Sequence, residues 1–432
     1  ELDLPEIMVT DFSNDSLCMA DIEWSEFYSD SLLKSLIVKT LENNKDMLTA
    51  SSKVEELQKR YRIAKTNLLP SISAEGLVDN ETNDYEGESF TSSPEFSAKA
   101  TLSWEIDLFG RLRWANKAAK FDYLSSLEAK RAMQMVLISE VATAYFELIA
   151  LDNELTIVRN TVSTRTENVR QAKLRFEGGL TSETSYQQSK VELASAASMI
   201  PKLEKEVKQK ENELSFLAGE YPSHIERSKL MGLTTMDNDS LQLGIPSYLL
   251  LRRPDLHQAE LELKTSMAEV GIAWADRFPR FVINLTGGLE NDALQGLLSS
   301  PFSYIAGEIA SPVFAFGRRK AQYEAAIERY NQNRYQYEKA VLNAFKEVND
   351  AVIAYTSAKE TVHLMQILKE SAQKYIELAY FQYINGYINY IDVLDAQRKY
   401  FDAQIDLSNA EKDEHLALIQ LYKALGGGWS VE

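Results

Sequence analysis

The clearest hydrophobic pattern in the chain is a strict alternation over residues 96–108. Apolar side chains occupy every second position and polar ones stand between them, the apolar set being Phe96, Ala98, Ala100, Leu102, Trp104, Ile106 and Leu108. A period of two predicts a β-strand with one apolar and one polar face. At about 13 residues the strand exceeds the usual length in globular proteins, about five or six. Apolar-out, polar-in alternation is typical of membrane barrels, although an amphipathic strand on a soluble sheet would show it too.

Shorter alternating runs predict three more strands, at residues 71–79, 280–289 and 302–310. Polar segments at 80–93 and 290–300 read as the loops between paired strands. The chain is therefore expected to contribute two pairs of strands.

Two stretches lack glycine and proline for far longer than an ordinary helix. They are the 67 residues between Gly110 and Gly178 and the 68 between Gly317 and Gly386. The mean helix has about 11–12 residues, so each stretch predicts one very long helix, about 100 Å at 1.5 Å per residue. Further helices are expected at 24–69, 181–218 and 255–277.

Three glycines recur at a fixed distance, which indicates an internal repeat. Gly110, Gly179 and Gly219 return 207 residues later as Gly317, Gly386 and Gly426. Upstream of the strands the offset becomes 209, as in Pro70 and Pro279. The chain is thus read as two copies of one unit, each with two strands and a helical hairpin of one long and one shorter arm.

Four strands cannot close a barrel, for which about eight is the practical minimum. Open sheet edges do not occur in lipid. If the strands span a membrane, several chains must therefore supply one barrel. The long helices likewise need lateral neighbours to bury their apolar stripe.

Composition excludes several classes of function. Lys and Arg number 46 against 64 Asp and Glu, a net charge of -18, and such an acidic chain is a poor nucleic-acid binder. A single cysteine, Cys18, excludes an internal disulfide or thiolate cluster. Cofactor and catalytic motifs are absent from the sequence, so we expect no cofactor, no metal centre and no enzyme.

No run of about 18 uninterrupted apolar residues predicts a transmembrane helix; the nearest, 135–151, carries Glu140 and Glu147. The chain begins at Glu1 without Met, which is the expected appearance after removal of a signal segment.

Three classes of function compete: an export channel of the outer membrane, a periplasmic adaptor, and a soluble coiled-coil scaffold. Adaptors usually carry one helical hairpin, and a scaffold leaves the paired strands of both halves unexplained. Dependence on detergent for extraction separates the first class from the other two.

Several separated motifs resemble those of TolC/OprM-type outer-membrane efflux factors, in the same order and across nearly the whole chain. They are Trp104-Glu105-Ile106-Asp107-Leu108-Phe109-Gly110-Arg111, Leu251-Arg252-Arg253-Pro254-Asp255-Leu256 and Asp392-Val393-Leu394-Asp395-Ala396-Gln397-Arg398. The resemblance implies a mainly α fold with a transmembrane β part. Three chains would form a 12-strand β-barrel continuous with a 12-helix α-barrel in the periplasm.

The resemblance also implies function and partners. The homotrimer would be the passive exit channel of a tripartite efflux system, from the periplasm to the outside. A periplasmic adaptor would join it to an inner-membrane transporter of the resistance-nodulation-division type. Relatives of the OprM kind carry an acylated amino-terminal Cys; such a Cys would precede Glu1 in this numbering, because Cys18 lacks a convincing lipobox.

The expected organisation has seven parts. They are an amino-terminal equatorial segment with the first helix (1–70), the first barrel strands (71–108), the first α-hairpin (109–218), an inter-repeat equatorial segment with the second half's first helix (219–278), the second barrel strands (279–316), the second α-hairpin (317–425) and a carboxyl-terminal equatorial tail (426–432).

Three sets of site residues follow. Lipid-facing positions are Phe96, Ala98, Ala100, Leu102 and Trp104. The hairpin tips, expected to contact the adaptor, are Gly178, Gly179, Leu180, Thr181 and Ser182 in one half and Asn385, Gly386, Tyr387 and Ile388 in the other. Asp392 and Asp395 share one helix face by their i, i+3 spacing and are expected to ring the periplasmic gate, attracting cations and raising one another's pKa. Tight-turn geometry and helix-start charge remain the alternative explanations of the last two sets.

Overall fold

The computed structural model describes residues 19, 22–83, 91–228, 252–310 and 316–429. Cys18 and most of the inter-repeat stretch lie outside these residues. The chain divides into two compact units. The first comprises residues 1–51, 129–255 and 340–432, and the second comprises 52–128 and 256–339.

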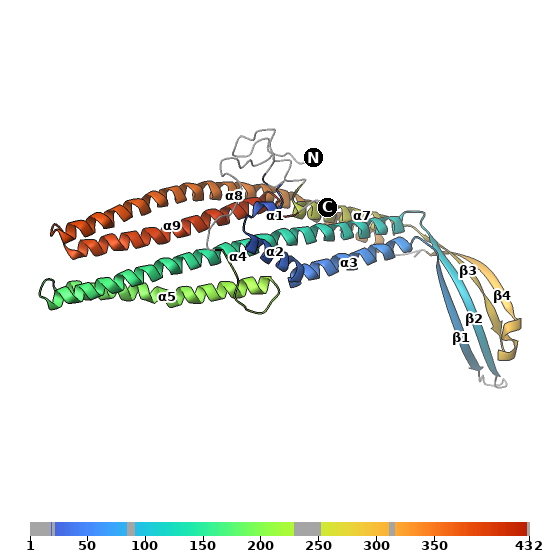
Figure 1. The fold of residues 1–432 in the computed structure, drawn as a ribbon. Helices are drawn as coiled ribbons and strands as arrows, with labels where there is room; N and C mark the ends of the chain where they lie inside the picture. The colour runs from blue at the N-terminus through green and yellow to red at the C-terminus, as the bar shows by residue number, and fades with distance from the viewer. Residues whose placement is uncertain (1–18, 20–21, 84–90, 229–251, 311–315, 430–432) are drawn as a thin grey trace. The chain divides into compact units, whose positions relative to one another are not determined.

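Helices account for most of the described chain, in the order seen in Figure 1. The amino-terminal helices are α1 Trp24–Phe27, α2 Ser31–Asn43 and α3 Lys45–Thr66. The first hairpin is α4 Arg111–Glu177 with α5 Glu183–Leu217, and the second is α8 Arg318–Ile384 with α9 Tyr390–Ala424. Helix α7, Pro254–Ala275, precedes the second strand pair. Helices α3, α4, α7 and α8 each pass from one unit into the other.

Corresponding helices in the two halves have equal lengths. Helices α4 and α8 have 67 residues each, α5 and α9 have 35 each, and α3 and α7 have 22 each. The glycines at 110, 179, 219, 317, 386 and 426 all adopt positive φ, between 72° and 86°. This backbone conformation is readily available only to glycine, which explains why glycine recurs at the helix ends.

The expected single helix over residues 24–69 was wrong in one respect, because the structure breaks it into three. Asp30 begins α2 by accepting hydrogen bonds from the N–H groups of Leu32 and Leu33. Asn44 separates α2 from α3: its Oδ1 accepts the N–H groups of Asp46 and Met47, and its Nδ2 donates to the carbonyl of Leu217. Side-chain capping of this kind ends one helix and begins the next without proline.

The second unit contains one antiparallel sheet in the order β1-β2-β3-β4. The strands are β1 Ser71–Asn83, β2 Thr91–Ile106, β3 Arg280–Asn291 and β4 Pro301–Ala310. The expected loop at 80–93 is therefore too long, because β1 and β2 continue their pairing as far as Asn83 and Thr91. The loop expected at 290–300 begins two residues later, because β3 continues to Asn291, and it includes a short 3-10 helix, Leu294–Ser299.

The first unit is held by aromatic packing and by buried arginines. Phe27 stacks on Tyr422 with ring centroids 4.1 Å apart. Arg253 is buried and donates to Asp255, to Glu347 and to the carbonyl of Ala424. This arginine belongs to the Leu-Arg-Arg-Pro-Asp-Leu motif, which therefore ties the start of α7 to α8 and to the end of α9.

A second buried ion pair fixes the segment that follows α5. The carboxylate of Glu211 accepts hydrogen bonds from Arg227, His224 and Lys208. Burial alone would raise the pKa of Glu211, but these hydrogen bonds lower it to about 2. Arg227 also bridges to Asp152 of α4, so the 220–228 segment is anchored to both arms of the first hairpin.

Candidate membrane-spanning surface and hairpin tips

One face of the sheet carries no charged side chain at any described position. Register places Ile72 opposite Leu102, Leu102 opposite Leu285 and Leu285 opposite Ile305, a single apolar row across all four strands. Other members of this face are Ala74, Gly76, Val78, Phe96, Ala98, Ala100, Trp104, Ile106, Phe281, Ile283, Gly287, Leu289, Ser303, Gly307 and Ile309, and toward the loop end Asn80, Pro94, Asn291 and Pro301. We call this surface the apolar face.

On the central strands β2 and β3 the apolar face is the more exposed one. Trp104 and Leu285 are 41% and 44% exposed, whereas Ser97 and Thr286, on the opposite face, are buried. On the edge strands β1 and β4 both faces are largely exposed. A soluble sheet would bury its apolar face and expose its polar one. The inverted arrangement is that of a membrane barrel, in which the apolar side chains contact lipid.

The opposite face carries the charged side chains of the sheet and is internally hydrogen-bonded, although Leu77, Val282 and Phe302 also lie on it. The hydroxyls of Thr101 and Thr286 lie 3.0 Å apart across the central strands. Lys99 forms an ion pair with Glu75 on the neighbouring strand, at 3.3 Å. These contacts are those expected of a face that lines water rather than lipid.

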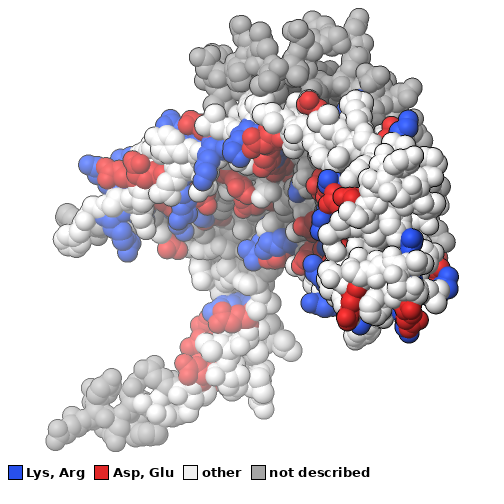
Figure 2. Space-filling model, turned by 90° about the vertical axis from the view of Figure 1, so that its left-hand side faces the viewer, with Lys and Arg blue, Asp and Glu red and all other residues white. Residues whose placement is uncertain are grey.

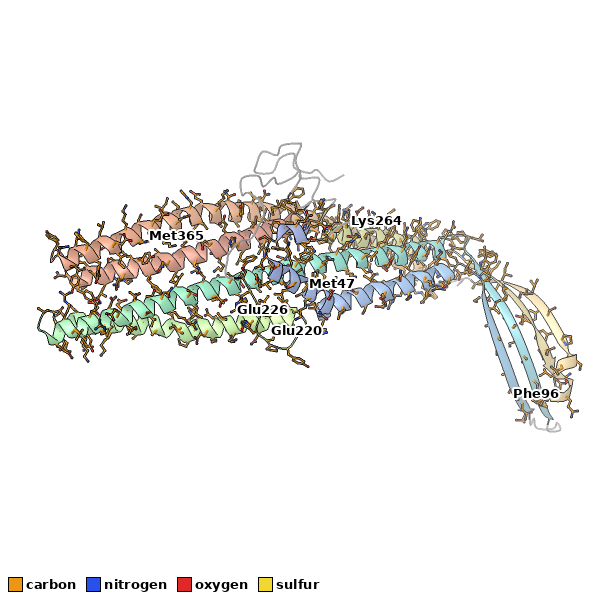
Figure 3. The ribbon with its side chains drawn as sticks, viewed as in Figure 1. Met47, Phe96, Glu220, Glu226, Lys264 and Met365 are labelled. Carbon is orange, nitrogen blue, oxygen red and sulfur yellow. The ribbon has the colours of Figure 1, made fainter. Side chains whose placement is uncertain are left out.

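The five predicted lipid-facing residues share the apolar face. Ala98 and Ala100 are exposed, Phe96 and Leu102 are half-buried, and Trp104 is 41% exposed. Phe96 lies near the loop end of β2 (Figure 3). Trp104 lies at the helix end, where its indole N–H donates to the carbonyl of Leu68 at 3.3 Å. An amphipathic ring with one polar contact suits a membrane–water interface. Their contact with lipid stays a prediction.

The join between β2 and α4 is a feature that sequence reasoning treated only as a family signature. Arg111 donates two hydrogen bonds to Glu105 Oε1 and one to Oε2, and its Nη2 lies 2.8 Å from each oxygen. Asp107 accepts the N–H groups of Leu112 and Arg113 and so satisfies the start of the long helix. The acid-x-acid-x-x-x-Arg spacing could have signalled this junction.

Both hairpin tips have the same backbone. At the first tip the N–H of Leu180 donates to the carbonyl of Arg175 and that of Gly179 to Phe176; at the second, Tyr387 donates to Gln382 and Gly386 to Tyr383. These are the hydrogen bonds of a Schellman turn. Leu180 is 74% and Tyr387 is 78% exposed, so each tip presents a large apolar side chain. Ser182 caps α5 and Asn389 stands at the start of α9.

The acidic pair lies at the start of α9, as expected, but each member has a local partner. Asp392 accepts the N–H of Asn389 at 3.0 Å. Asp395 pairs with Lys399 at 2.9 Å and with Arg398 at 2.7 Å, and these bonds lower its pKa. Within one protomer these cations, three and four residues later on the same helix, therefore lower the pKa of Asp395. The expected raising of one carboxylate's pKa by another concerns carboxylates gathered from several copies and stays a prediction.

One described helix, α4, contains a window long and apolar enough to cross a membrane by composition, and 67% of that window is buried inside the protein. Core helices pass the same test. On the helical surface seen in Figure 2, acidic and basic side chains are intermingled. Among the residues that the structure describes, no group of three His, Cys, Asp or Glu side chains is placed to hold a metal ion.

Comparison with known proteins places this architecture in a family. Residues 36–220 and 245–427 match the family described as Outer membrane efflux protein. The cation efflux system protein CusC of Escherichia coli O6:H1 is 33% identical over 417 residues, covering 94% of this chain and 88% of CusC. The solvent efflux pump outer membrane protein SrpC of Pseudomonas putida is 31% identical, covering 94% and 87%.

Solved structures of outer-membrane channels share the fold of this chain. A crystal structure of CusC superposes with a TM-score of 0.87 at 29% identity, covering 99% of both chains. The open state of the Neisseria gonorrhoeae MtrE outer membrane channel gives 0.90 at 26% identity, covering 99% of this chain and 96% of MtrE.

The chain therefore belongs to the outer membrane efflux protein family. It is an outer-membrane channel protein of an efflux system and extends from the outer membrane into the periplasm. The matched relatives are channel and transport proteins rather than enzymes. The family match across both halves decides against the adaptor and the coiled-coil scaffold as alternatives.

A charge placed on the apolar face tests the membrane assignment. Leu102→Arg is expected to destabilise the folded protein in lipid by about 2–4 kcal/mol if the site lies near mid-bilayer. Ser103→Arg, one residue along on the polar face, is the matched control and should cost much less. Heat stability and folded yield in lipid vesicles measure both. Equal behaviour of the two variants would contradict the assignment of faces.

Proposed function

We propose that three copies of this chain form the passive exit channel of a tripartite efflux system, without bond chemistry of their own. Each copy would supply four strands to a shared 12-strand barrel and four helical arms to a 12-helix tunnel. A periplasmic adaptor would connect the tunnel to an inner-membrane transporter of the resistance-nodulation-division type.

The main support for a barrel shared between copies is the sheet with its two open edges. Its lipid-compatible face is continuous over four strands, yet β1 and β4 each pair with a described strand on one side only. Unpaired backbone groups facing lipid cost several kcal/mol each. Pairing β4 of one copy with β1 of the next satisfies both edges and closes a barrel of adequate size.

Helix α8 supports association independently. Leu342, Ile353, Leu364 and Tyr375 are exposed by 71%, 59%, 54% and 41% and recur every 11 residues, about three helical turns. Nearer the tip Leu378, Phe381 and Ile384 are also exposed, but their positions turn progressively away from this stripe. An apolar stripe of this length on a single protomer is expected to be covered by a partner, and a second copy is the partner that the open sheet already requires.

Mass measurement in mild detergent tests the assembly. The expected species contains three copies, because four strands per copy then give a closed barrel. A monodisperse monomer that stays in solution without detergent would contradict both the shared barrel and the membrane assignment.

The tips are proposed to contact the adaptor through Leu180 and Tyr387, with Gly178, Thr181, Ser182, Asn385 and Ile388 completing the two turns. Gly179→Trp and Gly386→Trp should each abolish export while leaving the oligomer intact. No atom lies within 4 Å of a Cβ built at either glycine, so the indole would project from the turn, where positive φ adds local strain. Lys202→Trp, on the exposed side of α5, is the control for adding an indole elsewhere. Full substrate resistance in both tip variants would exclude the contact.

The gate proposal concerns Asp392 and Asp395, which threefold symmetry would gather around one axis. Asp392→Ala combined with Asp395→Ala should change single-channel conductance and weaken block by multivalent cations in planar bilayers. Lys399 and Arg398 lower the pKa of Asp395. This carboxylate therefore stays charged as the pH falls to the ordinary Asp range, and cation block should persist there. Conductance and block that match the parent protein would leave both residues as helix-start charges.

A further inference from the structure

The two strand pairs meet where β2 pairs with β3, and aromatic rings pack together at the helix end of this pairing, which we call the internal seam. Phe109 follows β2, and Phe278 stands two residues before β3. Their rings stack with centroids 4.4 Å apart and planes 15° apart. Trp274 packs edge-on against Phe278, at 4.9 Å. The contact lies at the helix end of the sheet, where β2 and β3 are neighbours.

The same two segments occur again at the outer edges of the sheet. Phe316 stands 207 residues after Phe109, in a second Phe-Gly-Arg sequence that follows β4. Leu69 stands 209 residues before Phe278 and precedes β1. The turn backbones agree bond for bond, because Leu69 donates to Thr66 as Phe278 donates to Ala275, and Asn67 donates to Ile63 as Asp276 donates to Ile272.

At the outer edges these segments lack the covering that they have at the internal seam. Phe316 is fully exposed, and among the described residues it is the one non-glycine with positive φ, 45°. Leu69 is 64% exposed, whereas Phe278 is half-buried. Ile63 is 60% exposed, whereas its counterpart Ile272 is half-buried. A bulky residue such as Phe316 is strained at positive φ. Such strain persists where surrounding contacts offset it, and the described residues of one chain leave Phe316 exposed.

We propose that Phe316 of one copy packs on Leu69 of a second copy and reproduces between copies the Phe109–Phe278 contact within the chain. We call this contact the clasp. The proposal rests on the proposed trimer and adds to it a specific pair of residues and a specific strand register. It commits the exposed edge to one occupant, which is another copy of this chain.

The register follows from the same offsets. Leu102 of β2 lies opposite Leu285 of β3, and adding 207 to the first and subtracting 209 from the second gives Ile309 opposite Gly76. The next pair is Glu308 opposite Leu77. This alignment keeps Ile309 and Gly76 on the apolar face and Glu308 and Leu77 on the other. A slip of one residue would turn one strand over.

Helix packing above the seam is consistent with the clasp. Inside the chain the indole of Trp114 fills the space over Gly271, where an added Cβ would meet the ring at 2.4 Å. The corresponding positions between copies are Ala321 and Arg62, both exposed. Inside the chain the large residue comes from the helix after β2 and the small one from the helix before β3. Between copies the helix after β4 would supply the small Ala321 and the helix before β1 the large Arg62, which can fill the same volume.

Cysteine cross-linking tests the clasp in the full-length protein with Cys18 replaced by Ser. One tagged chain carries Phe316→Cys and a differently tagged, co-expressed chain carries Leu69→Cys. A short bifunctional thiol reagent should join the two tags, and the product should disappear when either cysteine is returned to the parent residue. Phe109→Cys with Phe278→Cys in one chain is the matched control and should give internal cross-links only.

The register is tested separately by oxidation of opposed cysteines. Glu308→Cys with Leu77→Cys should form a disulfide between copies, because opposed Cβ atoms are within bonding reach and diagonal ones are not. Glu308→Cys with Glu75→Cys or with Asp79→Cys should form little. A stronger product from either shifted pair would overturn the register.

A third measurement needs no cysteine and covers variants that assemble poorly. Phe316→Ala and Leu69→Ala should each lower the temperature at which the oligomer dissociates, and the double variant should add little to the larger single effect. Strictly additive shifts, or absence of the tag-to-tag cross-link in a protein whose mass is three copies, would overturn the clasp and leave the trimer standing. A monomeric mass would instead overturn the proposed function itself.

Discussion

The unpaired backbone groups along β1 and β4 are the constraint on which the rest of this architecture depends. A sheet whose outward face is uncharged over four strands is suited to lipid, and lipid offers no hydrogen-bond partner to an open edge. One chain cannot resolve this conflict, because four strands are too few to close. The apolar stripe of α8 presents a related difficulty, because its side chains are exposed on a single protomer. In the proposed assembly both are covered by a neighbouring copy, and the protomer is one segment of a ring.

Much of this fold could be predicted from the sequence because its elements are long and regular. The 67 residues from Arg111 to Glu177 contain neither glycine nor proline, so nothing local interrupts α4. The alternation from Phe96 to Trp104 fixes the face of each side chain whatever the exact ends of β2. The break at Asn44 was missed although Asn is a local capping residue, and its second contact, with the carbonyl of Leu217 far along the chain, could not be predicted. The strand ends near residues 83 and 91 were missed because the strands continue there through polar residues that the hydrophobic alternation does not mark.

The candidate sites likewise divide into features that follow from local sequence and features that depend on charge partners. Glycine at positive φ, as at Gly179 and Gly386, can be anticipated from a repeated helix stop, and both turns were located correctly. Charge partners are harder to foresee from composition. The sequence prediction for Asp395 considered only neighbouring carboxylates. In the structure Lys399 and Arg398 lie one turn away on its own helix and pair with it. The half-buried Arg227 was not recognised and the buried Arg253 was recognised only as part of a motif, because their partners come from segments distant in sequence.

The equal arm lengths of the two hairpins have a consequence for recognition. The turns at Gly179 and Gly386 share hydrogen bonds and backbone angles, yet the side chains around them differ: Gly178, Leu180 and Thr181 in one, Asn385, Tyr387 and Ile388 in the other. A partner that binds both turns thus contacts the same backbone conformation at two places, with different side chains at each. Such a partner can use the shape to dock in repeated fashion and the chemistry to distinguish the two positions. Duplication followed by divergence at the turns would let a simple symmetric scaffold carry alternating, non-equivalent docking points.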